Sequence, residues 1–395
     1  MNKHSYFQGS GPRPDQRLEL PRVARQRLRD GAYYLASTDL ANAVNVALTL
    51  RIPLLLTGEP GSGKSRLANR IAWELRLNRP SHEPFEFVIK SDTRGADLFY
   101  GFDTVGRFHA AQIVKQTEKE GDIEARIAPQ RFITFNALGR AILYAKPKSF
   151  LTRTLELPDY LDVVKNHPGE RPDSPSVVLI DEIDKAPRDV PNDILTEIEN
   201  MRFRIPEFEI ARGEEVHVAL EEEEQDRRPI VIITSNSEKA LPDAFMRRCA
   251  YFNLESPPFR ADGSKTDDEV TVEDIIESRL GKSFGQGDRF DDLAFLTDCV
   301  AFLRYLRVNE SLALGRKPAM AEFIDWLRVV LPDENGSDIP GSLNDLRGAA
   351  RDRFIDSIRT TLLKEPRTQG RAEEIFRGFG QWKTQDDNAK NRKKL

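Results

Sequence analysis

The sequence predicts an α/β core with a parallel sheet, followed by a smaller all-helical domain. Short apolar runs alternate with segments of helical periodicity up to about residue 255, and this alternation is typical of βαβ units. The apolar runs are too short for helices and indicate buried strands of a parallel sheet. Beyond this point only helical periodicity continues.

The core begins with a predicted helix over 38–50, which Thr38 can cap. A glycine-rich loop follows the first strand, and a second helix is predicted over 65–77. The predicted strands are four apolar runs, and they cover 52–56, 85–89, 176–180 and 230–234.

The second domain begins after Pro257 and Pro258, which break the chain. Its predicted helices cover 272–280, 290–306, 320–331 and 343–363. We therefore divide the chain into a polar N-terminal segment 1–32, an α/β core 33–256, a helical domain 257–383 and a basic tail 384–395. The tail is polar, so we expect it to be disordered.

Composition excludes several classes of protein. The 59 Lys and Arg against 64 Asp and Glu give a net charge of −5, which disfavours a protein that binds nucleic acid without sequence preference.

The two cysteines cannot build a disulfide framework, as expected in a reducing cytoplasm. No apolar stretch approaches the roughly 18 residues that span a bilayer, and the polar N-terminus does not resemble a secretory signal. No histidine lies at metal-ligand spacing, which disfavours a zinc enzyme.

Residues 58–65 match the phosphate-loop pattern G-x-x-x-x-G-K-[ST]. Glycines let successive N–H groups point at one anion, and the next helix adds its free N–H groups and positive dipole end. Lys64 supplies a charge near the β- and γ-phosphates, and Ser65 can bind Mg²⁺. The alternative, a glycine turn with a solvated lysine, is disfavoured by the position between a strand and a helix. The candidate nucleotide-binding residues are Gly58, Glu59, Pro60, Gly61, Ser62, Gly63, Lys64 and Ser65.

Two later strands also end in polar side chains. Asp181 and Glu182 follow a run of four apolar residues, at the edge where ligands bind in open α/β sheets. Asp181 would hold Mg²⁺ with Ser65, and Glu182 would act as general base on the attacking water. Asn236 follows the last predicted strand and can bridge that water and a γ-phosphate. Taken alone, a charged turn and an Asx turn would also explain these residues.

Arg247 and Arg248 follow on a short helix that begins near Pro242. Each arginine offers a planar, permanently charged fork for phosphate oxygens. Two solvated arginines are the alternative interpretation.

Four other features receive simpler interpretations. Asp184 and Lys185 read as helix-entry or subunit-contact residues. The acidic run 221–224 reads as a solvated loop, and 147–174 as an extra polar loop.

The order of these motifs resembles that of the AAA+ ATPases. The runs 181–187 and 193–199 are similar to the D-E-I-N-[RK]-A and A-L-L-E-A-M-E segments of the MoxR branch. The same branch has segments that resemble 91–98, 241–248 and 317–327. The resemblance covers about residues 33–365 and implies an AAA+ P-loop core with a helical lid.

This resemblance implies roles for individual residues. Arg248 falls on the arginine finger, which acts on the nucleotide of a neighbouring subunit, and Arg247 is expected to share that task. Asn236 falls on the sensor 1 position. Lys317 is the first candidate for the sensor 2 position, and Arg316 is the second.

The resemblance also implies partners. Residues 101–131 fit an insertion in the second helix, and 203–217 fit a hairpin before sensor 1. In relatives both segments face the axis of a ring and touch a client protein. Relatives often act with a partner that carries a von Willebrand A domain.

We therefore expect a cytoplasmic ATPase that uses ATP and Mg²⁺, forms a homo-oligomeric ring, most simply a hexamer, and remodels a protein. Two alternatives stay open. One is a DNA-acting or restriction-type motor subunit that uses ATP or GTP, which the near-neutral charge and the lack of a DNA-binding motif disfavour. The other is a nucleotide-binding module that does not hydrolyse, which the full set of motif residues disfavours.

Overall fold

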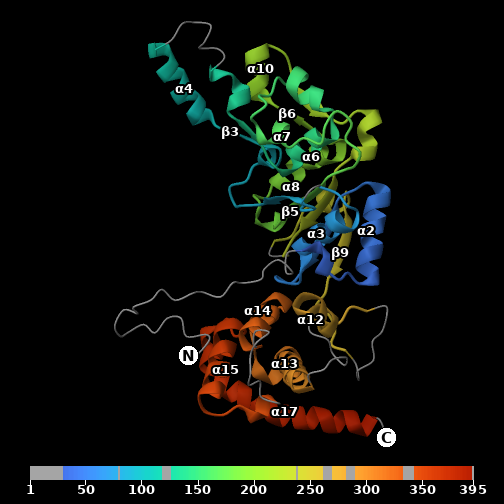
Figure 1. Cartoon of the computed structure of the whole chain (residues 1–395), viewed down its shortest axis with the longest axis vertical. Helices are drawn as coiled ribbons and strands as arrows, with labels where there is room; N and C mark the ends of the chain where they lie inside the picture. Colours follow the sequence, from blue (N-terminus) through green and yellow to red (C-terminus); the bar gives the residue numbers. More distant parts are fainter. Residues whose placement is uncertain are drawn as a thin grey trace.

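The computed structural model describes residues 30–78, 81–117, 126–236, 239–260, 269–281, 290–331 and 342–393. Figure 1 shows an α/β core that carries the sheet and, below it, a helical domain in orange and red. The helical domain has a hydrophobic core of its own. Among the described helices, none combines the length and apolarity that a membrane crossing needs. The predicted fold class, an α/β core followed by a helical domain, is confirmed.

The central sheet has five parallel strands in the order β2-β5-β8-β1-β9. They are β1 (Leu54–Gly58), β2 (Phe85–Val88), β5 (Val177–Asp181), β8 (Ile230–Thr234) and β9 (Ala250–Leu254). The four predicted strands are confirmed, with ends that differ by at most two residues. The prediction missed β9, because this edge strand exposes Tyr251 and Asn253 and so lacks a continuous apolar run.

Helices cover both faces of the sheet, and they are α2 (Thr38–Leu50), α3 (Lys64–Glu74), α6 (Ala137–Ala145), α7 (Asp162–Lys165), α8 (Val190–Asp193), α9 (Leu195–Asn200) and α11 (Asp243–Met246). Successive strand residues point to opposite faces, so Leu54 and Leu56 share a core with α2 and α3, whereas Leu55 shares one with α6 and α9. Ser37 caps α2, and not the predicted Thr38, because Ser37 has the extended backbone of a cap and its Oγ accepts the Leu40 N–H.

One arm extends the core away from the helical domain (Figure 1). It pairs β3 (Tyr100–Phe102) with β4 (Ile133–Phe135) in antiparallel register and carries α4 (Thr104–Thr117). In the sequence the arm lies between β2 and α6 and includes the described residues of the predicted insertion over 101–131, of which 118–125 lie outside the described residues.

A second antiparallel pair lies beside the first arm. It joins β6 (Arg202–Arg204) to β7 (His217–Ala219), with α10 (Pro206–Arg212) between them. The hairpin expected over 203–217 is therefore present, but its tip is a helix. Phe203 stacks on Phe99 with 5.1 Å between ring centroids, which anchors this pair on the core.

The helical domain contains α12 (Val272–Leu280), α13 (Phe290–Val308), α14 (Met320–Val330), α15 (Gly348–Thr361), α16 (Pro366–Gly370) and α17 (Ala372–Lys393). Phe302, Trp326 and Phe379 are fully buried at its centre. Helix α17 continues to Lys393, so the backbone over 384–393 is helical where disorder was expected, and the last two residues of that tail lie outside the described residues. The residues of α17 that pack into the domain core, such as Ile375 and Phe379, all precede residue 384. The tail continues the helix that this packing stabilises.

The acidic run 221–224, predicted to be a solvated loop, and the extra polar loop 147–174 both contribute residues to the core. Glu224 of the acidic run is 8% exposed, and its carboxylate lies 2.7 Å from Nζ of Lys146, which is 3% exposed. In the segment 147–174, Leu151 and Val164 are fully buried. The solvated-loop interpretation therefore holds for 221–223, which are exposed, but not for Glu224, because its partner Lys146 lies elsewhere in the sequence.

We expect Lys146→Met to lower the free energy of unfolding by about 3 kcal/mol, because it leaves the Glu224 carboxylate buried without its cation. Lys165→Met is the matched control: Lys165 is exposed, and a change within about 0.5 kcal/mol is expected. Urea unfolding followed by circular dichroism measures both. Equal stabilities of the two variants would show that the buried pair does not stabilise the fold.

Candidate functional site

The phosphate-loop sequence joins β1 to α3, at the edge of the sheet where the parallel strands end. Its shape requires glycines. Gly58 has a φ of +140°, and a Cβ there would lie 2.3 Å from the Leu254 carbonyl oxygen. Gly63 has a φ of +98° and directly precedes α3. The first N–H groups of α3 are therefore available to an anion held by the loop.

The Lys64 side chain lies inside this loop. Its Nζ donates to the main-chain oxygens of Gly58 at 2.7 Å and Glu59 at 2.9 Å, and the residue is only 5% exposed. Burial lowers the pKa of Lys64, and nearby carboxylates, Asp181 foremost, oppose this shift. An ammonium group has three N–H donors, so these two bonds leave a third for a phosphate oxygen.

Asp181 connects two elements at the same edge of the sheet. Its Oδ1 accepts a hydrogen bond from Ser65 Oγ at 2.8 Å and another from Thr234 Oγ1. Thr234 Oγ1 in turn accepts the Glu182 backbone N–H at 3.0 Å. The two predicted magnesium ligands are thus in contact, and a threonine that sequence reasoning missed holds the acidic pair in place.

The oxygen atoms of Ser65 and Asp181 fit Mg²⁺. This ion prefers oxygen ligands and is usually bound by one or two carboxylates together with waters and substrate phosphates. In the part of the chain that the structure describes, no group of three or more His, Cys, Asp or Glu side chains forms a metal site. A Mg²⁺ ion with few protein ligands is compatible with this arrangement.

Glu182 has an unusual backbone conformation for its residue type. Its φ of 61° and ψ of 48° are left-handed, and such strain is found most often at functional sites. Asn236 Nδ2 donates to its Oε1 at 3.3 Å, and Lys185 Nζ donates to its Oε2 at 2.6 Å. Buried Asp184 accepts the Asn236 N–H at 3.1 Å. Asp184 and Lys185 therefore position the candidate base and Asn236 within one subunit, a role that the sequence interpretation missed.

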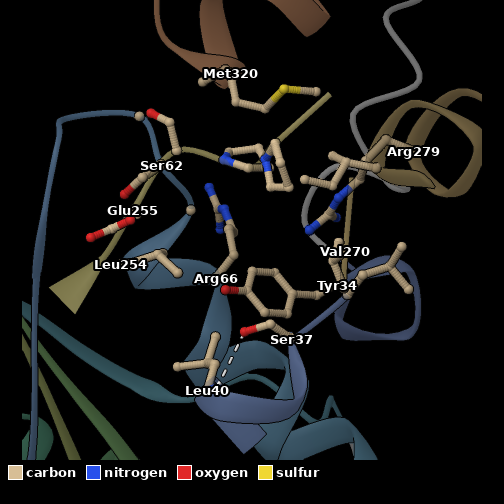
Figure 2. Close-up of a pocket in the computed structure, with 18 of the residues that line it drawn as sticks. Tyr34, Ser37, Leu40, Ser62, Arg66, Leu254, Glu255, Val270, Arg279 and Met320 are labelled. Carbon is tan, nitrogen blue, oxygen red and sulfur yellow. Dashed lines mark hydrogen bonds between the residues drawn. The ribbon is translucent and has the colours of Figure 1, made fainter. Parts of the chain in front are cut away.

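A pocket of about 660 Å³ opens beside the phosphate loop. Figure 2 shows that Tyr34 and Arg66 line it from the core, and Arg279 and Met320 from the helical domain. Arg279 lies 5.8 Å from the centre of the Tyr34 ring, and burial lowers the pKa of this arginine. Ser62 Oγ also lines the pocket, where it is buried with no hydrogen-bond partner among the described residues. A ligand in the pocket would satisfy this atom.

The chain was compared with known protein families and with solved structures. Residues 53–249 match the family described as the AAA domain of the dynein-related subfamily. The chain has an AAA domain. The crystal structure of the FIGL-1 AAA domain in complex with ADP is similar to 84% of this chain and 77% of its own, with 13% identity and a TM-score of 0.31. No curated protein matches the chain at a significant level.

The AAA domain keeps its arginine pair away from its own phosphate loop. Arg247 and Arg248 precede β9, whose first residue pairs with Leu54 at the start of β1. The loop follows the other end of β1, about 13 Å away at roughly 3.3 Å per strand residue. Arg248 is exposed, and its Nε lies 3.4 Å from Glu199 Oε2. One subunit therefore does not bring all the predicted site residues together.

The sensor 2 candidates lie in the loop before α14. Lys317 is exposed. Arg316 pairs with Glu322 of α14 at 3.2 Å, so the helical domain itself binds this second candidate. The pocket residues Tyr34 and Arg279 had no motif that would reveal them, because the fold brings them together from distant segments.

We expect Ser62→Ala to raise the free energy of unfolding of the ligand-free protein by about 1 kcal/mol, because it removes a buried hydroxyl without a partner. The same substitution should reduce the stabilisation that added nucleotide gives. Thermal unfolding with and without Mg²⁺-ATP measures both effects, and Ser174→Ala, at a hydroxyl bonded only to exposed Asp173, is the control. A Ser62→Ala protein that is less stable than wild type without ligand would contradict the assignment of Ser62 Oγ as a buried hydroxyl without a hydrogen-bond partner.

Proposed function

We propose that this AAA protein is a Mg²⁺-dependent ATP hydrolase of the MoxR type that works as a homo-oligomeric ring in the cytoplasm and remodels or matures a client protein. One observation carries the proposal. Five side chains of the types that phosphoryl transfer needs lie together at one edge of the sheet. They are Lys64, Ser65, Asp181, Glu182 and Asn236.

Each of these groups has a role in the proposed reaction. The loop N–H groups and Lys64 hold the β- and γ-phosphates. Ser65 and Asp181 would hold Mg²⁺, which when bound neutralises charge on the transferred phosphoryl group. Glu182 orients the attacking water and accepts its proton, while Asn236 fixes the Glu182 carboxylate. Catalysis is then mainly positioning and electrostatic stabilisation.

The pocket beside the loop supports a nucleotide as the ligand. Its volume of about 660 Å³ lies within the range of small-molecule sites. Apolar side chains such as Met320 and Ile324 line it together with Tyr34, and they suit a flat base. The phosphates would then extend towards Gly61 and Gly63, which line the same pocket.

In the proposed ring, Arg248 of one subunit completes the site of the next. The exposed arginine pair lies at the opposite edge of the sheet from the phosphate loop, so it cannot serve its own nucleotide without a large rearrangement. A neighbour's guanidinium at the γ-phosphate would stabilise transition-state charge. Arg247 shares this task, Lys317 acts as sensor 2 from the helical domain, and six subunits are expected.

The proposed client surface lies on the first arm and on α10. Helix α4 exposes the apolar side chains Val105, Phe108 and Ile113, each more than 60% accessible, and α10 exposes Ile210. Val105 and Phe108 are three residues apart and so lie on one face of α4, and contiguous exposed apolar surface is typical of interaction sites. A partner with a von Willebrand A domain is part of the same proposal.

We expect Lys64→Ala and Glu182→Gln to separate binding from turnover. Lys64→Ala removes a charged contact with phosphate and should weaken ATP binding about 10- to 100-fold. Glu182→Gln should bind ATP but lose about 10²- to 10⁴-fold in turnover, because the general base is absent. A fluorescent ATP analogue and a phosphate-release assay measure the two steps, with exposed Glu223→Gln as control. Equal loss of binding in both variants would mean that Glu182 is structural.

We expect activity per subunit to rise with protein concentration, because the active site is shared. Arg248→Ala should lower turnover by about 10³-fold. Mixing the Arg248→Ala and Lys64→Ala variants should restore part of the activity. In a mixed ring, the intact arginine of a Lys64→Ala subunit can reach the intact phosphate loop of an Arg248→Ala neighbour. Phosphate release from nanomolar to micromolar protein measures both effects. A flat rate and no rescue would contradict the shared site.

A further inference from the structure

One arginine of the helical domain reaches the phosphate loop. Arg307 lies near the end of α13, and its Nη2 donates to Glu59 Oε2 at 3.1 Å and to Ser256 Oγ at 2.6 Å. Its Nη1 donates to the Pro318 carbonyl oxygen at 2.5 Å. Ser256 Oγ also donates to Glu59 Oε2 at 3.0 Å. One guanidinium therefore joins the phosphate loop, the link between the domains and the loop that leads into α14.

Glu59 connects this guanidinium to the phosphate-binding lysine. Its main-chain oxygen accepts Lys64 Nζ at 2.9 Å, while its carboxylate accepts Arg307. Partial burial acts to raise the pKa of Glu59, but hydrogen bonds from Arg307 and Ser256, together with the positive charges of Arg307 and Lys317, outweigh burial and lower the pKa. Glu59 is therefore ionised at neutral pH. Glu59 therefore contacts Lys64 through its main chain and Arg307 through its side chain.

The start of α14 rests on the same loop. The Ala321 N–H donates to the Gly61 carbonyl oxygen at 3.3 Å. A Cβ at Gly61 would lie 3.0 Å from the Ala319 Cβ, so the two backbones are in close contact. Helix α14 also supplies Met320 to the pocket wall. By holding Pro318, Arg307 fixes the segment that covers the pocket.

We propose that Arg307 is a positioning residue that couples the helical domain to the phosphate loop, so that a nucleotide at Lys64 sets the position of α14 through Glu59. This inference rests on the proposed function, since it takes the ligand to be a nucleotide. The coupling does not require any side chain of the helical domain to touch the γ-phosphate. An ion pair that served stability alone would leave the response of α14 to nucleotide unchanged.

The test follows hydrogen exchange of Met320–Val330 in the full chain, with and without Mg²⁺ and a non-hydrolysable ATP analogue. Wild type should exchange more slowly in α14 when the analogue binds. Arg307→Gln should bind a fluorescent analogue about five- to tenfold more weakly and, at saturation, leave α14 exchange unchanged. Arg304→Gln is the matched control, because Arg304 lies on the same helix and contacts Asp386 instead, and it should behave as wild type.

A second variant changes the other partner of the contact between Arg307 and Glu59. Glu59→Gln removes the charge that holds Arg307 and should lose the same α14 response, so the proposal stays testable even if Arg307→Gln does not fold. Normal slowing of α14 exchange in either folded variant at saturation would overturn the inference. A wild-type protein that binds no nucleotide would overturn the proposed function instead, so the two failures are distinguishable.

Discussion

The candidate site depends on one carboxylate at the end of a buried strand. Asp181 Oδ1 accepts hydrogen bonds from the hydroxyl groups of Ser65 and Thr234. Ser65 is the last residue of the phosphate-loop motif, and Thr234 is the last residue of β8. Strand β8 lies between β5 and β1, so these bonds hold together the ends of three strands. Parallel packing makes this possible, because the carboxyl ends of all strands meet at one edge. The loop, the acidic pair and Asn236 become one site for this reason.

The helical domain also contributes residues to this site, and no local sequence motif predicts their contacts. It closes the pocket with Met320 and Arg279, and it binds the phosphate loop through Arg307. The core alone would leave the loop open on this side. A ligand that enters the pocket therefore contacts both domains. Binding can for this reason change how the helical domain is held against the core.

The sequence predicted those features that depend on neighbouring residues. Four strands, the phosphate loop and the pair Asp181 and Glu182 were predictable, because a short apolar run followed by polar residues has few other structural solutions. Edge strand β9 gives a weaker pattern, since half of its side chains face solvent. Arg307 and Glu59 are 248 residues apart, and no periodicity links such partners. The buried pair of Lys146 and Glu224 was missed for the same reason.

In the proposed assembly, a glycine loop, two acids and a neighbour's arginine surround one triphosphate. The most direct test is an experimental structure of the assembled Glu182→Gln variant with Mg²⁺-ATP. We expect Lys64 and Asp181 to lie on opposite sides of the β- and γ-phosphates, with Arg248 or Arg247 of the adjacent subunit in hydrogen-bond contact with the terminal phosphate. A nucleotide bound elsewhere, or a subunit interface without either arginine, would contradict the account.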